Sequence, residues 1–129
     1  MSRFGKFHLL MAVVITLLSV WTLSGQHSGH QAKEPKAVTL KGEVVDLTCY
    51  LSHGSRGPAH AKCAQMCLDK GLPMGLLTHD GALYVILEDH GQPQAYQTLK
   101  GLAAKTVTVK GPVYSRNGMR GIAVQSVTK

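Results

Sequence analysis

Charged and aromatic side chains are scarce in this chain of 129 residues. Charged residues make up 16% of the sequence and aromatic residues 5%, whereas apolar residues reach 44%. A disordered chain carries more charge and less apolar surface, so this composition predicts a folded protein. The length suits one small domain and excludes a multidomain enzyme.

Familiar catalytic and nucleotide-binding motifs are also absent from the sequence. It contains no serine–histidine–acid set, paired carboxylates, Gly-rich phosphate loop or dinucleotide fingerprint. Lysine and arginine outnumber acidic residues by 14 to 7, but they are scattered singly and form no basic run. The pattern therefore favours a non-enzymatic role and predicts no nucleic acid partner.

The first 25 residues have the pattern of an export signal. Two basic residues near the start precede an apolar stretch, residues 7–23, that has no Asp, Glu, Lys or Arg, and Ser24 and Gly25 follow it. This order is typical of a secretory signal peptide. If it is not cleaved, the stretch is long enough to be an N-terminal membrane anchor. Both interpretations predict a periplasmic or other extracytoplasmic location.

Residues 26–37 are polar, contain Pro35 and predict a flexible linker. Residues 38–129 then predict one domain that is mostly β. Strands are expected at 38–49, 74–78, 82–88, 106–115 and 119–127, and helices at 59–70 and 95–104. The pairs Asp80-Gly81 and Asn117-Gly118 predict tight hairpin turns.

Two of the expected strands share a sequence pattern with a central glycine. Residues 39–45 match residues 108–114 almost position for position, with Gly42 and Gly111 in the same place. A glycine within a strand indicates a bulge or bend, as at the corner of a closed barrel. In its element order and bent strands the chain resembles small exported bacterial OB-fold proteins.

The resemblance implies a five-stranded OB-like barrel. A Cys/His-bearing helical insertion follows strand 1, and a short helix lies between strands 3 and 4. A small β-sandwich is the alternative architecture.

All three cysteines and two of the seven histidines fall within residues 49–67. On one helix, His60, Cys63 and Cys67 would share a face, and Cys49 at the end of the preceding strand could close the set. Three sulfurs and one imidazole form a tetrahedral site suited to Cu(I) or Zn²⁺, with His53 as a reserve ligand. Nearby thioethers, from Met66 and Met74, would favour copper.

Two other functions remain open for this cluster. In an oxidising compartment, Cys49 could form a disulfide with Cys63 or Cys67 and fasten the insertion of a non-catalytic binding module. A bridge between Cys63 and Cys67 is the least suitable, because i,i+4 positions hold Cβ atoms about 5–6 Å apart where a disulfide needs about 3.8 Å. The second alternative is a thiol redox protein with His60 as base, although no carboxylate is expected to orient that histidine.

Other polar residues have simpler interpretations. Asp46 either orients a ligand histidine or is an exposed strand residue, and the exposed position is favoured. His79 and His90 are expected in solvated turns. The sequence thus predicts an exported metal-binding protein whose site contains three cysteines and one histidine. Its expected partners are a metal ion and a periplasmic or membrane protein.

Overall fold

The computed structural model describes residues 35–129. The predicted signal or anchor, residues 1–25, and the predicted linker up to residue 34 lie outside the described residues. Over residues 35–129, no helix has the length and apolar character needed to cross a bilayer.

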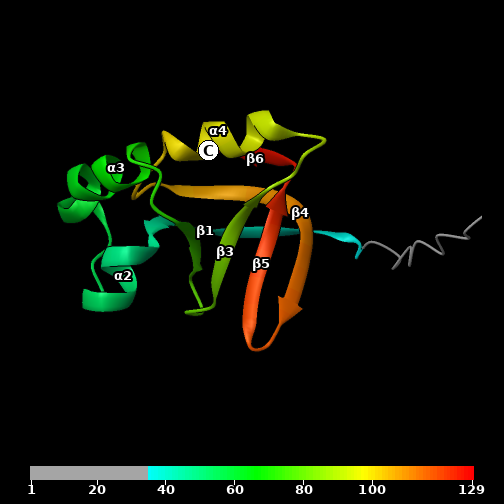
Figure 1. Cartoon of the computed structure of the whole chain (residues 1–129), viewed down its shortest axis with the longest axis horizontal. Coiled ribbons are helices and arrows are strands. Elements are labelled where there is room, and N and C mark those ends of the chain that lie inside the picture. The colour runs from blue at the N-terminus through cyan, green and yellow to red at the C-terminus, as the bar shows by residue number, and fades with distance from the viewer. Residues whose placement is uncertain (1–34) are drawn as a thin grey trace, which may run out of the picture. The chain divides into compact units, whose positions relative to one another are not determined.

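Six strands and four helical segments make up this part of the chain (Figure 1). The strands are β1 (Ala37–Asp46), β2 (Met74–Thr78), β3 (Leu83–Glu88), β4 (Thr106–Arg116), β5 (Met119–Val124) and β6 (Ser126–Thr128). The helices are α2 (Leu47–His53), the 3₁₀ helix η1 (Pro58–His60), α3 (Ala61–Asp69) and α4 (Pro93–Lys100). The predicted fold class is confirmed: the domain is mostly β, with helices after β1 and between β3 and β4.

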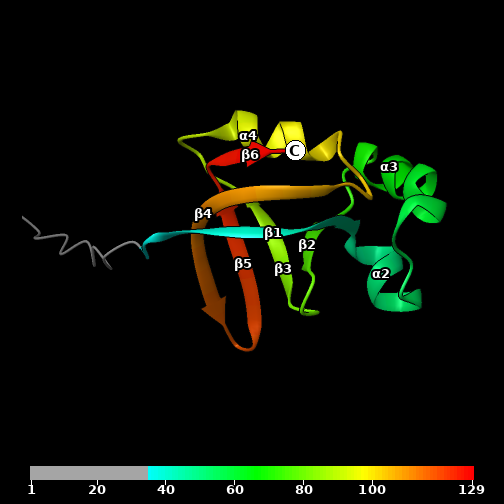
Figure 2. The ribbon, with the colours of Figure 1, turned by 180° about the vertical axis from the view of Figure 1, so that it is seen from behind.

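Five strands close into a barrel in the order β1-β2-β3-β5-β4, because β4 also pairs with β1. The pairing of β3 with β5 is parallel, and the other strand pairs are antiparallel. This is an OB-like strand order. The short β6 adds to β4, and α4 lies beside it (Figure 2).

The two glycine-bearing segments pair with each other and bend where each strand changes partner. Strand β1 pairs with β4 through residues 37–43 and with β2 through residues 42–46. A Cβ atom on Gly42 would lie 2.5 Å from the carbonyl oxygen of Leu77, and one on Gly111 only 1.9 Å from that of Ala123. Real Cβ atoms do not approach so closely, so the backbone crossing itself requires glycine at both positions.

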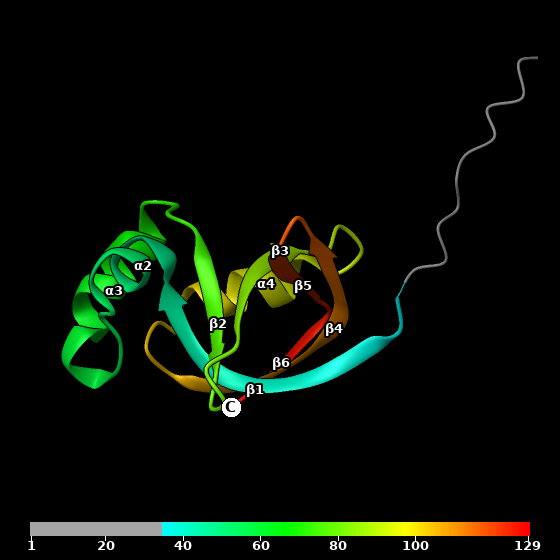
Figure 3. The same cartoon turned by 90° about the horizontal axis from the view of Figure 1, so that it is seen from below.

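The hydrophobic core fills the barrel and reaches the insertion. Its buried members come from the strands, from α3 and α4, and from the connection between α4 and β4; they are Val44, Ala64, Leu68, Met74, Leu76, Ile86, Leu99, Ala103, Val107, Val109, Ile122 and Val124. A smaller cluster of Val45, Leu47 and Leu77 lies under α2. Helices α2 and α3 lie together at the end of β1 (Figure 3).

Element boundaries differ from the sequence prediction at several places; the helix expected at 95–104, for example, is α4, Pro93–Lys100. The first strand ends at Asp46 instead of residue 49, so Cys49 belongs to α2. The last predicted strand is divided at Gln125, whose N–H donates to the carbonyl of Lys110 as the chain passes from β5 to β6.

Candidate metal centre

Asp46 starts the first helix of the insertion. Its carboxylate accepts hydrogen bonds from the N–H groups of Thr48, at 3.1 Å, and Cys49, at 3.3 Å. These are the contacts of a helix N-cap, and they end β1 by turning the chain into α2. Asp46 is only 1% exposed, so the favoured interpretation of an exposed strand residue is wrong.

The loop after α2 places His60. Gly54 ends α2 in the left-handed conformation, with φ of 69°. The N–H of Gly57 then donates to the Glu43 carboxylate on β1, and the N–H of His60 donates to the carbonyl of Gly57 at 3.0 Å. Pro58, at the first position of η1, has the fixed φ that a helix start accepts. His60 is thus held between the barrel and α3.

Helix α3 carries the other two cysteines. Cys63 and Cys67 are separated by one helical turn and share a face of the helix. Ala64 and Leu68, on the neighbouring face, are 2% and 1% exposed in the barrel core. This packing fixes the rotation of α3 and directs its cysteines toward α2.

The structure brings the cluster together as two overlapping triads. The Sγ atoms of Cys49, Cys63 and Cys67 all lie within 4.8 Å of one another. A carboxylate oxygen of Asp46, the Cys49 Sγ and a ring nitrogen of His60 form a second group with the same limit. The two groups share Cys49. The Cys/His cluster predicted from the sequence is therefore present, although His60 does not group with the two cysteines of α3.

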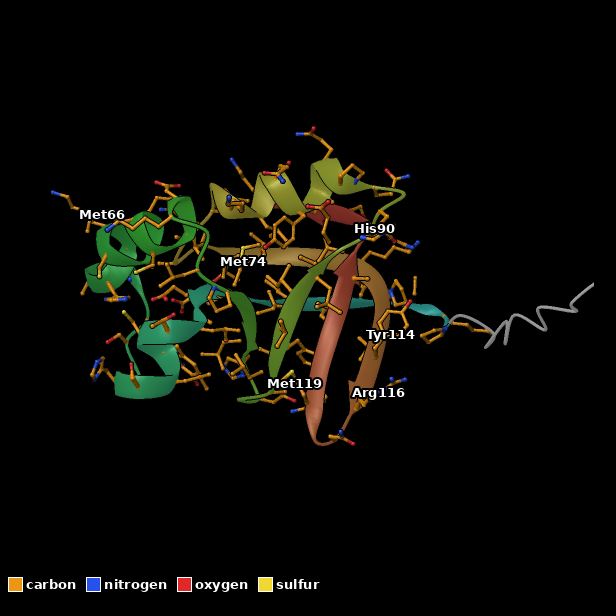
Figure 4. All side chains as sticks on the ribbon, viewed as in Figure 1. Met66, Met74, His90, Tyr114, Arg116 and Met119 are labelled. Carbon is orange, nitrogen blue, oxygen red and sulfur yellow. The ribbon has the colours of Figure 1, made fainter. Side chains whose placement is uncertain are left out.

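Three other sulfur or imidazole groups were predicted nearby. His53 lies in the last turn of α2, is exposed and belongs to neither triad, so its ligand role stays a prediction. Met74 is 1% exposed and packs in the barrel core, whereas Met66 on α3 is 50% exposed (Figure 4). Of the two predicted thioethers, only that of Met66 is at the surface.

One ring nitrogen of His60 makes no hydrogen bond to the described residues. Its Nε2 lies 3.6 Å from Oδ2 of Asp46, which is too long for a normal hydrogen bond. Among the described residues this buried nitrogen has no hydrogen-bond partner. Buried polar atoms are nearly always paired, so the arrangement leaves a nitrogen available to a further group in the centre.

The Asp46 carboxylate also controls the Cys49 thiol. It raises the pKa of Cys49 to about 12, first by accepting a hydrogen bond from the thiol, with burial and the negative charge adding to the effect. Burial, followed by the charge of Asp46, raises the pKa of Cys67. A protonated thiol is a poor nucleophile, so these shifts argue against a thiol enzyme that attacks through Cys49.

All three cysteines lie in the described part of the chain, and each is free of a disulfide. Cys63 is exposed, while Cys49 and Cys67 are half-buried. The cluster can therefore offer three sulfur ligands to one ion, or any of them to an oxidant.

One carboxylate in this centre lies where the sequence interpretation did not favour it. Asp46, for which an exposed strand position was favoured over the orientation of a ligand histidine, lies beside His60. The signal that identifies it is a capping residue directly before a helix, but the apolar residues on both sides of it, Val45 and Leu47, conceal that boundary.

The described chain is thus a five-stranded mixed β-barrel that carries a Cys/His group capable of holding a metal ion. Its interpretation depends on this geometry alone, because comparison with models of protein families, with curated proteins and with solved structures found no match to the chain.

Proposed function

We propose that this protein binds a thiophilic metal ion through Cys49, Cys63 and Cys67, with Cu(I) as the preferred ion. The observation that supports the proposal is the mutual approach of the three Sγ atoms to within 4.8 Å. Two sulfurs that share an ion at about 2.3 Å each lie no more than about 4.6 Å apart. The thiols of the free protein already stand close to that separation.

The number of sulfur ligands favours Cu(I) over Zn²⁺. Thiolate ligands select both ions, so the ligand type does not separate them, but the first triad offers three sulfurs and no fourth ligand. Structural Zn²⁺ almost always takes four ligands. Within this centre the fourth would be Nε2 of His60, which now groups with Asp46 and Cys49 and would have to approach the cysteines of α3.

Asp46 and His60 have a supporting role in this proposal. Both contact the region of Cys49 from the barrel side, and outer groups of this kind orient metal ligands. Loading the ion releases the Cys49 proton, and the adjacent carboxylate and imidazole can accept it.

We further propose that the domain works outside the cytoplasm. The basis is the basic, apolar and small-residue order of residues 1–25. Cell fractionation, followed by intact-mass measurement of the isolated protein, tests this. A mature mass that lacks the first 25 residues or so supports cleavage, retention in the membrane fraction at full mass supports an anchor, and recovery at full mass from the cytoplasm would refute export.

Metal binding is tested on protein reduced and isolated without oxygen. Equilibrium dialysis against Cu(I), with elemental analysis and a thiol count on the same sample, should give about one ion per chain. Cys63→Ser and Cys67→Ser should weaken binding strongly. Ser52→Ala, on α2 but outside both triads, is the matched control.

Two further variants identify the ligand set. Loss of the imidazole in His60→Ala should spare Cu(I) binding and weaken Zn²⁺ binding, and His53→Ala tests the reserve ligand. Stoichiometry that is unchanged in both serine variants would exclude the sulfur triad. An isolated protein with no metal and a mass two hydrogens below the reduced value would instead support a structural disulfide from Cys49.

A further inference from the structure

We propose that the ion is cargo, which enters and leaves the centre over Cys63 by ligand exchange with a thiol of another molecule. The inference rests on the proposed metal binding and goes beyond it, since a bound ion can equally be a permanent part of a fold. Three features of the structure distinguish these roles: the exposure of the ligands, the anchoring of the insertion and the residue beside Cys63.

The three thiols differ in their exposure to solvent, and the most exposed one differs most in burial from Asp46. Asp46, at the barrel side, is 1% exposed, and Cys49 and Cys67 are half-buried. Cys63 is exposed. Structural metal sites are typically closed, whereas sites that exchange a ligand keep an open position. The open side of this centre is therefore the side of Cys63.

The insertion that carries the cysteines is anchored without a metal. Leu47 on α2 and Ala64 and Leu68 on α3 are all buried, at 6%, 2% and 1% exposed. The N–H of Leu47 donates to the carbonyl of Pro73 at 2.9 Å, which joins the start of α2 to the chain just before β2. Small zinc domains that need their ion to fold have no such core of their own. Here the hydrophobic core already fixes both helices, so the ion is not needed to hold them.

A thioether lies next to the open side. Met66 is three residues after Cys63 on α3, so the two side chains share a face of the helix. The side chain is 50% exposed, so its thioether is accessible from solvent (Figure 4). A soft sulfur at the surface beside an exposed thiolate offers a departing Cu(I) ion a second ligand of the kind it prefers.

Ligand exchange accounts for the transfer without any change of oxidation state. The incoming thiol loses its proton to water as its sulfur binds the ion, and the bond from the ion to Cys63 breaks. Cys49 and Cys67 release the ion next, and each thiolate that is set free takes up a proton from water. The acceptor is thus a thiol-bearing molecule, either a small thiol or a cysteine of a partner protein.

Two measurements test the proposal, one on the metal-free protein and one on the Cu(I)-loaded protein. First, the metal-free, reduced protein should give the circular dichroism spectrum and cooperative unfolding of a folded domain. Second, Cu(I)-loaded protein is mixed with increasing glutathione, and the rate of ion transfer is followed by rapid mixing. For exchange over an open ligand the rate should rise in proportion to the glutathione concentration.

Two variants test whether ligand exchange takes place on the side of Cys63. Met66→Trp should slow transfer to glutathione roughly tenfold without loss of bound metal, because its bulk covers the open side. Gln94→Trp, on an exposed position of α4, is the matched control and should transfer at the rate of the unchanged protein. An equal rate in Met66→Trp would move the exchange to another face.

The outcomes separate this inference from the function on which it rests. Protein that binds no Cu(I) would refute both. Protein that binds Cu(I) but unfolds when the ion is removed, or that releases it at a rate independent of glutathione, would retain the metal site and overturn the cargo role.

Discussion

The buried carboxylate of Asp46 serves two purposes that substitution can separate. It caps α2 by accepting the N–H groups of Thr48 and Cys49, and it raises the pKa of the Cys49 thiol. Alanine at this position removes both effects. Asparagine removes the charge but retains a side-chain oxygen, and it is as good an N-cap as aspartate.

The expected losses follow from these roles. Replacing an N-cap Asp by Ala costs about 0.5–2 kcal/mol of stability. For a domain of this size each kcal/mol corresponds to roughly 4–8 °C in Tm, so Asp46→Ala should lower Tm by about 2–16 °C. Asp46→Asn keeps the cap and should stay within about 0.5 kcal/mol of the unchanged protein. Without the carboxylate, the pKa of Cys49 should fall from about 12 toward the ordinary value of 9.0.

Thermal unfolding of the reduced, metal-free proteins measures the first effect. The second is measured by the rate of alkylation of Cys49 by iodoacetamide as a function of pH, with the modified peptide identified by mass spectrometry. In Asp46→Asn the rise in alkylation should begin at lower pH. The reasoning fails if both variants lose the same stability, or if Asp46→Asn leaves the titration of Cys49 where it was.

Two further predictions concern the barrel. Gly111→Ala should destabilise the domain by about 1–3 kcal/mol or more, because its Cβ would collide with the carbonyl of Ala123. Gly101→Ala is the control and should be tolerated, because its Cβ would meet only an ordinary contact at 3.7 Å. Urea unfolding compares the two variants, and equal midpoints would contradict the close backbone approach at Gly111. A hydrogen bond from Gln125 and one from a backbone N–H lower the pKa of Asp89, so the stability they provide is present above about pH 4 and is lost as the pH falls through the lowered pKa. Gln125→Ala should therefore be less stable than the unchanged protein near neutral pH, and the difference should shrink as the pH falls through the lowered pKa of Asp89. A difference that stays undiminished in acid would refute the assignment.

Much of the fold was accessible from the sequence because its signals are local. The hairpin turns at Gly81 and Gly118 have the expected positive φ, and the alternation of apolar residues gave the strands. Gly42 and Gly111 were predicted to mark a bulge or bend in their strands, and in the structure the backbone of another strand comes too close to either glycine for a Cβ atom. The barrel itself was expected from the resemblance to OB-fold proteins, which rested on these features and on the helix between the third and fourth strands.

The centre was harder to predict because its details depend on where helices begin. Apolar residues stand on both sides of Asp46, at Val44, Val45 and Leu47, so the hydrophobic pattern gives no sign that β1 ends at Asp46. His60 was placed on one helix with Cys63 and Cys67, but it lies in a 3₁₀ turn, where each residue advances by a larger angle than in an α-helix. That difference turns His60 away from the α3 cysteines and toward Asp46 and Cys49.

The division of β1 between two partners has a consequence for how the domain assembles. The second half of β1, α2, α3 and β2 form one continuous stretch of chain, whose ends meet in the pairing of Asp46 with Met74 and of Gly42 with Thr78. Closure of the barrel waits for β4, much farther along the sequence, and such distant pairings form slowly. All three sulfurs therefore lie between two strands that can pair in a nascent chain before β4 and β5 have been synthesised.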